Sequence, residues 1–138
     1  MKKIFIMLFI FAFLISGQMD RKNFSLLNYF DGEYFAYSST QQSDGINLGC
    51  CYMTKSKNVK NKTGESMVLY NFEVGNAIKT LQAKVIKTEY LSTGATVIYA
   101  YSDSIPTSIK LDDKAVNLQF ACYDDHCVIG WPTIIGSF

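Results

Sequence analysis

Apolar positions along much of the chain follow the two-residue period that is typical of β-strands. The clearest case is residues 115–123, where Val116, Leu118, Phe120 and Cys122 alternate with more polar neighbours. Because successive side chains of a strand point to opposite faces, this alternation predicts one buried and one wetter face. Comparable runs predict further strands at residues 34–39, 46–54, 65–72, 84–91, 95–101, 108–111, 128–130 and 133–138.

Short polar sequences predict how these strands are joined. Ser92-Thr93-Gly94 predicts a hairpin between residues 84–91 and 95–101, and Asp112-Asp113 and Asp124-Asp125 predict two more turns. Residues 40–45 are polar and are predicted as a loop. Since Pro132 has no N–H to donate, the strand ending at this residue is expected to lie at an edge or a bulge.

Two segments show helical spacing instead. Val74, Ala77, Ile78 and Leu81 fall at i, i+3, i+4 and i+7, which predicts one short helix. The apolar positions of residues 24–30 favour one or two helical turns.

Together these elements predict an α+β fold, in which a mostly antiparallel twisted sheet of roughly six to eight strands carries one short helix on one face. A small β-sandwich is the alternative. We expect residues 18–32 to be a leader that contains the short helical turns, and residues 33–138 to be a single α+β domain, because no repeat or linker divides them.

The N-terminus has the layout of a secretory signal. Lys2 and Lys3 precede an entirely apolar stretch, residues 4–15, and polar residues follow. As a helix this stretch spans about 18 Å, against about 30 Å of bilayer hydrocarbon. We therefore predict that residues 1–17 are a signal peptide, or a signal anchor if they stay uncleaved, since Ile15 and Gly17 depart from the A-x-A cleavage pattern. The protein is expected to be exported to the cell envelope or beyond it, with membrane contact only through residues 1–17.

Composition excludes several classes of function. The 138 residues carry 13 Lys+Arg against 12 Asp+Glu, which does not fit a nucleic-acid-binding protein. The single His excludes catalysis by two imidazoles. Phosphate-binding loops, zinc-protease helices, nucleophile elbows and dinucleotide fingerprints are all missing from the sequence, so we expect neither enzyme activity nor a cofactor.

Four cysteines remain in the expected mature chain. An even number in an exported protein favours disulfides. If Asp124-Asp125 is a two-residue turn, Cys122 faces Cys127 at a distance that a disulfide can bridge. Cys50 and Cys51 are adjacent, so bridges from them to Cys122 and Cys127 would need a bulge. A vicinal ring or reduced thiols are the other possibilities.

A metal site is the alternative use of the same side chains. Its candidate ligands are Cys50, Cys51, Cys122 and Cys127, with His126 as a substitute. Neither cysteine pair has the C-x2-C spacing with which two sulfurs grip one zinc ion. Adjacent residues of a strand also point apart, so His126 and Cys127 are not expected to form a catalytic dyad.

One predicted sheet face carries side chains suited to binding. If residues 95–101 and 115–123 are neighbouring strands, tyrosine rings and amide groups share a face that suits peptide or glycan. The candidate surface residues are Tyr99, Tyr101, Asn117, Gln119, Tyr123 and Trp131. Ordinary cross-strand packing is the competing interpretation, and Trp131 fits equally as a contact residue or as part of the core.

The last fifty or so residues contain four short blocks, namely residues 99–102, 116–119, 129–132 and 135–138. In these blocks the chain resembles small exported proteins of clostridial-type Gram-positive bacteria. The resemblance implies a bacterial, exported protein and carries over no site residues.

Two functional hypotheses follow. The first is a non-catalytic cell-envelope or secreted binding module that acts through its sheet face or edge. Its partner would be an envelope protein or a wall polymer rather than nucleic acid. The second is a thiol/disulfide or metal-binding protein that uses the four cysteines.

Overall fold

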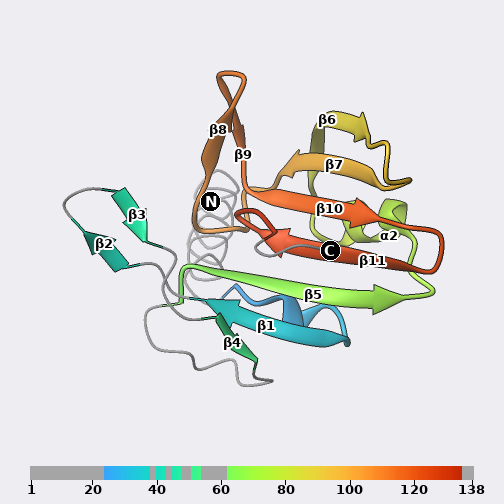
Figure 1. The fold of residues 1–138 in the computed structure, drawn as a ribbon, viewed down its shortest axis with the longest axis horizontal. Coiled ribbons are helices and arrows are strands. Elements are labelled where there is room, and N and C mark those ends of the chain that lie inside the picture. The colour runs from blue at the N-terminus through green and yellow to red at the C-terminus, as the bar shows by residue number, and fades with distance from the viewer. Residues whose placement is uncertain (1–23, 38–39, 43–44, 48–50, 54–61, 135–138) are drawn as a thin grey trace, which may run out of the picture.

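The structure is a computed structural model that describes the chain except residues 1–23, 38–39, 43–44, 48–50, 54–61 and 135–138 (Figure 1). The predicted signal segment therefore lies outside the described residues. The elements run in the order η1 (Leu26–Asn28), β1 (Glu33–Tyr37), β2 (Thr40–Gln42), β3 (Gly45–Asn47), β4 (Cys51–Met53), β5 (Gly64–Tyr70), α2 (Val74–Thr80), β6 (Lys84–Tyr90), β7 (Thr96–Tyr101), β8 (Ile109–Leu111), β9 (Lys114–Val116), β10 (Leu118–Cys122) and β11 (His126–Trp131).

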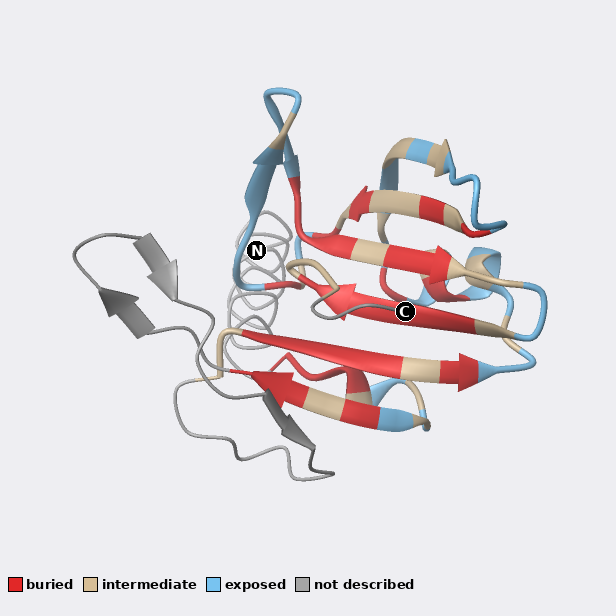
Figure 2. Ribbon diagram, viewed as in Figure 1, coloured by how far each residue is buried: buried red, intermediate tan, exposed pale blue. Residues whose placement is uncertain are grey.

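Seven strands form one sheet in the order β4-β1-β5-β11-β10-β7-β6, and every neighbouring pair is antiparallel (Figure 1). Strands β2 and β3 pair with each other, as do β8 and β9. One large sheet with a short helix confirms the predicted sheet-dominated α+β fold, and the described residues do not form the two stacked sheets of a β-sandwich. Figure 2 shows that β5, β10 and β11 are buried along most of their length, whereas the β8–β9 hairpin is largely exposed.

The hydrophobic core lies on the face of the sheet that α2 and η1 cover. Alternate residues of the strands supply its apolar side chains, and the helices add their own. Its fully buried members include Leu26, Ala36, Met67, Ala100, Leu118, Phe120 and Ile129, with Ala77, Leu81 and Ile105 almost as deep. Burial of this apolar surface is the main force that holds the helices on the sheet.

The predicted helix forms as α2, with Ala77 and Leu81 buried on its inner side. It ends where Leu81 N–H donates to the carbonyl of Ala77 and Gln82 adopts a positive φ of 50°. The segment predicted to contain one or two helical turns forms the single 3-10 turn η1 after Ser25, whose side chain accepts from Leu27 N–H.

Residues 115–123 form two strands rather than one, because Asn117 interrupts them. Its Oδ1 accepts from Ser102 N–H at 2.8 Å and its Nδ2 donates to the Ser102 carbonyl at 2.8 Å. Asn117 is fully buried, so the prediction that it lies on the wetter face is wrong. A buried amide is tolerated there because the chain itself satisfies its hydrogen bonds.

Several other predicted strand boundaries differ from the observed ones. The segment predicted as a loop over residues 40–45 contains β2 and the first residue of its partner β3. The strand predicted over residues 46–54 is divided between β3 and β4. Strand β11 ends at Trp131, before a cis peptide bond to Pro132, so the predicted break is present. The expectation that this strand lies at an edge of the sheet is wrong, because β11 pairs with β5 on one side and with β10 on the other. Thr133 and Ile134 form no strand, and the rest of the predicted terminal strand lies outside the described residues.

Within the described part of the chain, neither helix has the length and hydropathy needed to cross a bilayer.

Candidate binding site at the disulfide end of the sheet

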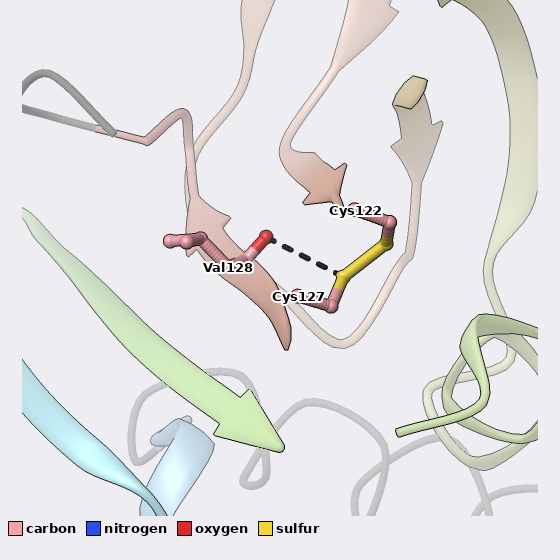
Figure 3. Close-up of a disulfide and its surroundings, with 3 residues drawn as sticks. All are labelled: Cys122, Cys127 and Val128. Atoms are coloured by element: carbon pink, nitrogen blue, oxygen red, sulfur yellow. Dashed lines mark hydrogen bonds between the residues drawn. A yellow bond between two sulfur atoms is a disulfide. The ribbon is translucent and has the colours of Figure 1, made fainter. Parts of the chain in front are cut away.

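A disulfide joins β10 to β11 next to the turn between them (Figure 3). Cys122 and Cys127 are direct cross-strand partners, with their Cα atoms 4.1 Å apart. Tyr123 N–H donates to the His126 carbonyl at 2.8 Å, which leaves Asp124 and Asp125 as the two turn residues. The predicted hairpin register and its bridge are thus both present in the structure.

Three aromatic rings lie close together at the ends of these strands. Pairing of β11 with β5 places His126 opposite Tyr70. The rings of Tyr123 and His126 stack with centroids 4.8 Å apart and planes 13° apart, and the Tyr70 ring lies 6.1 Å from that of His126. We call Tyr70, His126 and Tyr123 the ring strip.

The ring strip is accessible and its central ring is held in place. Tyr70 is 61% exposed. His126 Nδ1 lies 2.6 Å from Oδ1 of Asp125, and the Tyr123 ring covers one of its faces. The same hydrogen bond from His126 lowers the pKa of the Asp125 carboxyl, which favours its charged form. The strip is therefore a partly pre-organised aromatic surface with an anionic edge.

A hollow of about 380 Å³ opens beside the ring strip, between the β10–β11 hairpin and the connection from β5 to α2. Its lining residues are Asn71, Phe72, Glu73, Val74, Cys122, Tyr123, Asp124, Asp125, His126 and Cys127. Three of them carry carboxylates and none is Lys or Arg. Asn71 adopts a positive φ of 50°, a conformation that Asn tolerates better than most residues, and so turns the chain away from the sheet here. We call this space the hollow.

The groups that line this end of the sheet define what it offers chemically. His126 and Asp125 have the pairing of a catalytic dyad, but the lining residues include no Ser or Thr hydroxyl. Both cysteines of the hollow are bonded to each other, so neither is a thiolate nucleophile. What the lining offers is aromatic surface together with carboxylate and amide hydrogen-bonding groups.

The predicted surface face is present only in part. Strands β7 and β10 are neighbours, with Tyr99 opposite Gln119, and Tyr101 pairs with Lys84 at the next strand. Oε1 of Gln119 accepts from Ile134 N–H at 2.9 Å, and the Tyr99 hydroxyl lies 3.4 Å from a carboxylate oxygen of Glu89. These polar groups are engaged within the chain. Of the predicted surface residues, only Tyr123 belongs to the ring strip.

Two predicted surface residues are buried, and their assignment to the surface is corrected. Asn117 fixes the segment around Ser102, as described above. Trp131 lies in the core, and its Nε1 donates to Oε2 of Glu65 at 2.6 Å. Its ring packs edge-on against Phe24 with centroids 5.7 Å apart. Trp131 is therefore a core residue rather than a contact residue.

The three cysteines that the structure describes do not come together. Cys51 lies on β4, three strands away from β11 and at the opposite end of β5 from Cys127. From strand geometry the two Cα atoms are roughly 20 Å apart. Among the described residues no group of three or more His, Cys, Asp or Glu side chains is arranged to hold a metal ion. Cys50 lies outside the described residues.

One buried carboxylate was not singled out by the sequence. Glu65 is fully buried, and it accepts hydrogen bonds from Ser25 Oγ at 2.7 Å, Leu26 N–H at 2.7 Å and Lys62 Nζ at 2.7 Å. The indole of Trp131 and the hydroxyl of Tyr34 complete the set. With so many donors and no solvent contact, Glu65 is a structural link between η1 and the sheet.

The pKa of Glu65 reflects two opposed influences. Burial alone raises it, but the hydrogen bonds, first that from Lys62 and then those from Tyr34, Ser25 and Trp131, outweigh burial and lower it. Burial also raises the pKa of Tyr34, with the Glu65 charge adding to the effect. A signal for this residue exists in the sequence, because Glu65 shares its strand face with Met67 and Leu69 and must therefore point into the core.

The ring strip was harder to predict from the sequence than the burial of Glu65. Tyr123 and His126 flank a predicted turn and so face each other, but Tyr70 joins them only through the pairing of β5 with β11. Strands so far apart in sequence cannot be paired from periodicity alone.

In comparisons with known proteins, no protein-family model, curated protein or solved structure matches the chain.

Proposed function

We propose that this protein is an exported bacterial, non-catalytic binding module of the cell envelope or its surroundings, and that its ligand is a wall polysaccharide. The observation that carries the proposal is the ring strip of Tyr70, His126 and Tyr123 beside a hollow lined by carboxylates. Each part of that arrangement matches one chemical feature of a sugar.

The aromatic part matches the apolar faces of sugar rings. A pyranose presents C–H groups on its faces and hydroxyls at its rim, so it packs on an aromatic ring while its rim stays hydrogen-bonded. The ring strip lies across the ends of β10, β11 and β5, and the exposed Tyr70 ring and the stacked Tyr123–His126 pair are two neighbouring aromatic groups on which sugar units can pack.

The polar part selects the kind of polysaccharide. Glu73, Asp124 and Asp125 line the hollow and accept hydrogen bonds from hydroxyl, amide or amino groups. With no Lys or Arg beside them, they repel phosphate-rich polymers such as teichoic acid. We therefore propose a glycan with hydroxyl, N-acetyl or amino substituents.

The N-terminal sequence and one disulfide bond support export to the cell envelope or beyond it. The apolar stretch behind Lys2 and Lys3 favours secretion, and removal of residues 1–17 takes the net charge from +1 to −1. A disulfide at Cys122–Cys127 suits an oxidising compartment. The C-terminal resemblance to clostridial-type exported proteins supports a Gram-positive wall as the setting.

The test is co-sedimentation of the protein with insoluble glycans. Purified peptidoglycan stripped of teichoic acid, and chitin as a single-sugar polymer, are each mixed with the protein, and the bound fraction is measured against concentration. We expect retention by at least one of them. We expect Tyr70→Ala or Tyr123→Ala to weaken retention about 10-fold, since one lost stacking contact is worth about 1–2 kcal/mol.

The matched control is Tyr101→Ala. Tyr101 lies on β7, outside the ring strip and outside the lining of the hollow, so its removal tests the loss of a tyrosine as such. Unchanged retention by this variant, together with loss in the ring-strip variants, supports the proposal. Failure of the unaltered protein to sediment with either glycan contradicts it, and so does equal loss in all three variants.

A thiol/disulfide function remains the second candidate, on the observation that the Cys122–Cys127 bond itself lines the hollow. In such a reaction a thiolate of a dithiol substrate attacks Sγ of Cys122 and Cys127 departs as the thiolate. Cys127 is buried in the hydrophobic core, which makes its thiolate a poor leaving group. The binding proposal is therefore preferred.

A further inference from the structure

The free edge of the sheet at β6 has features of a self-complementary interface. In the described part of the chain β6 pairs only with β7, so its outer backbone groups have no strand partner (Figure 1). Large apolar side chains are unusually exposed here: Val85 at 44%, Tyr90 at 82% and Leu91 at 43%. We propose that two copies of this chain pair antiparallel through β6 about a two-fold axis at Thr88, which forms one continuous sheet.

The backbone geometry determines which residues can pair outward. Leu91 N–H donates to the Ala95 carbonyl at 2.9 Å, so Leu91 points its backbone groups toward β7. Because these directions alternate along a strand, Thr88 lies among the residues whose N–H and C=O point away from β7. A two-fold axis at Thr88 therefore creates a hydrogen-bonded pair of Thr88 with its copy in the partner.

Charge then favours this axis over its neighbours. With the axis at Thr88, Lys87 of each chain lies opposite Glu89 of the other, in the closely spaced type of pair. An axis at Lys87 would place two lysines opposite each other, and an axis at Glu89 would do the same with two glutamates. Like charges directly opposite destabilise strand pairing.

The groups around this pair are already arranged on one face. Within one chain Lys87 Nζ lies 2.6 Å from Glu89 and 3.3 Å from Asp112, with roughly two-fifths of the Lys87 and Glu89 side chains exposed. These contacts raise the pKa of Lys87, through Glu89 first and Asp112 second. In the pair, two lysines and two glutamates form an alternating row of opposite charges across the axis.

A bulge limits the length of the interface. The register of β6 against β7 shifts between Val85 and Lys87. Bulges and lysines are common means of protecting a sheet edge from indiscriminate pairing. Here they confine regular pairing to the segment around Thr88 and make the charge register selective, so the expected complex is a dimer rather than an open polymer.

The test uses charge reversal and mixing in the full chain, expressed with its own N-terminal segment, with mass measured by light scattering from micromolar to near-millimolar concentration. We expect the unaltered protein to dimerise. Lys87→Glu alone and Glu89→Lys alone each place like charges across the axis, and we expect each to raise the dimer Kd about 10- to 100-fold. An equimolar mixture of the two variants restores opposite charges across the axis, so we expect a heterodimer.

Mixing separates this proposal from a simple loss of structure, because the contacts within each chain stay broken in the mixture. Lys84→Glu is the matched control: it reverses a charge on the same strand but faces no charged residue in the proposed register, and we expect it to dimerise as before. A monomer at every concentration overturns the proposal. Undiminished dimers of the single variants, or two variants that fail to pair when mixed, overturn it equally.

Discussion

Glu65 is a side chain on which several long-range polar contacts converge. Its carboxylate connects Ser25 and Leu26 at the start of the described chain, Lys62 before β5 and Trp131 at the end of β11. A buried carboxylate costs solvation free energy, and it is retained only where donors surround it. Glu65 therefore fixes how η1 lies against the sheet.

Replacing Glu65 with Gln should lower the free energy of unfolding by about 3–5 kcal/mol, because an amide cannot satisfy donors placed around a carboxylate. Glu33→Gln, at an exposed position of β1, serves as the matched control and should change little. Urea unfolding at neutral pH measures both. Equal stability of Glu65→Gln and the unaltered protein would contradict the structural role given to this carboxylate.

The same residue sets an acid limit on stability. Its pKa in the folded protein lies below the ordinary value of 4.5, so its stabilising contribution is present above about that pH. The contribution is lost as pH falls through the lowered folded pKa. Unfolding measured against pH should show this loss below about pH 4.5 in the unaltered protein, and Glu65→Gln should lack that part of the decline.

Burial of individual polar residues was the hardest property to predict. Asn117 was expected on a wet face because it alternates with apolar neighbours, yet its hydrogen bonds to Ser102 let it sit in the interior. The sequence fitted Trp131 equally to the core and to the surface, and its hydrogen bond to the buried Glu65 places it in the core. In each case the partner is distant in the sequence, and no local pattern reveals it.

At the scale of elements, the β10–β11 hairpin is the part where local sequence and structure agree best. A two-residue turn fixes the register, and the register places Cys122 opposite Cys127. The hairpin of β8 and β9 follows the same rule, with Asp112 and Asp113 both at positive φ. Helix α2 was equally predictable, because its buried side is a local pattern.

The disulfide should contribute about 2 kcal/mol to the free energy of unfolding, since it closes a loop with a sequence separation of only 5. The double variant Cys122→Ala, Cys127→Ala should show this decrease, and reduction of the unaltered protein should reproduce it. Unfolding in denaturant with and without reductant measures the difference. An unchanged midpoint after full reduction would show that the bond does not constrain the hairpin.

The sequence patterns could not predict which strands distant in the chain pair with each other. Periodicity gave most strand positions but not the order β4-β1-β5-β11-β10-β7-β6. That order separates Cys51 from Cys127, so these two sulfurs do not converge as the alternative of a metal site required. It also brings Tyr70 to the hairpin.

At the scale of the whole molecule, the candidate site is a product of topology. The hollow is bounded by two segments some fifty residues apart in the chain, the β5–α2 connection and the β10–β11 hairpin. The disulfide-linked hairpin at the end of the sheet places aromatic and acidic side chains beside that hollow.

The most direct test of the binding proposal is a nuclear magnetic resonance titration with soluble chito-oligosaccharide or muropeptide fragments. Aromatic resonances of Tyr70, His126 and Tyr123 and backbone amides of residues 71–74 and 123–126 should shift together with one saturation curve, while those of Tyr90 and Tyr99 stay in place. Shifts confined to Tyr99 and its neighbours on β7, or no saturable shift with either fragment, would contradict the proposed site.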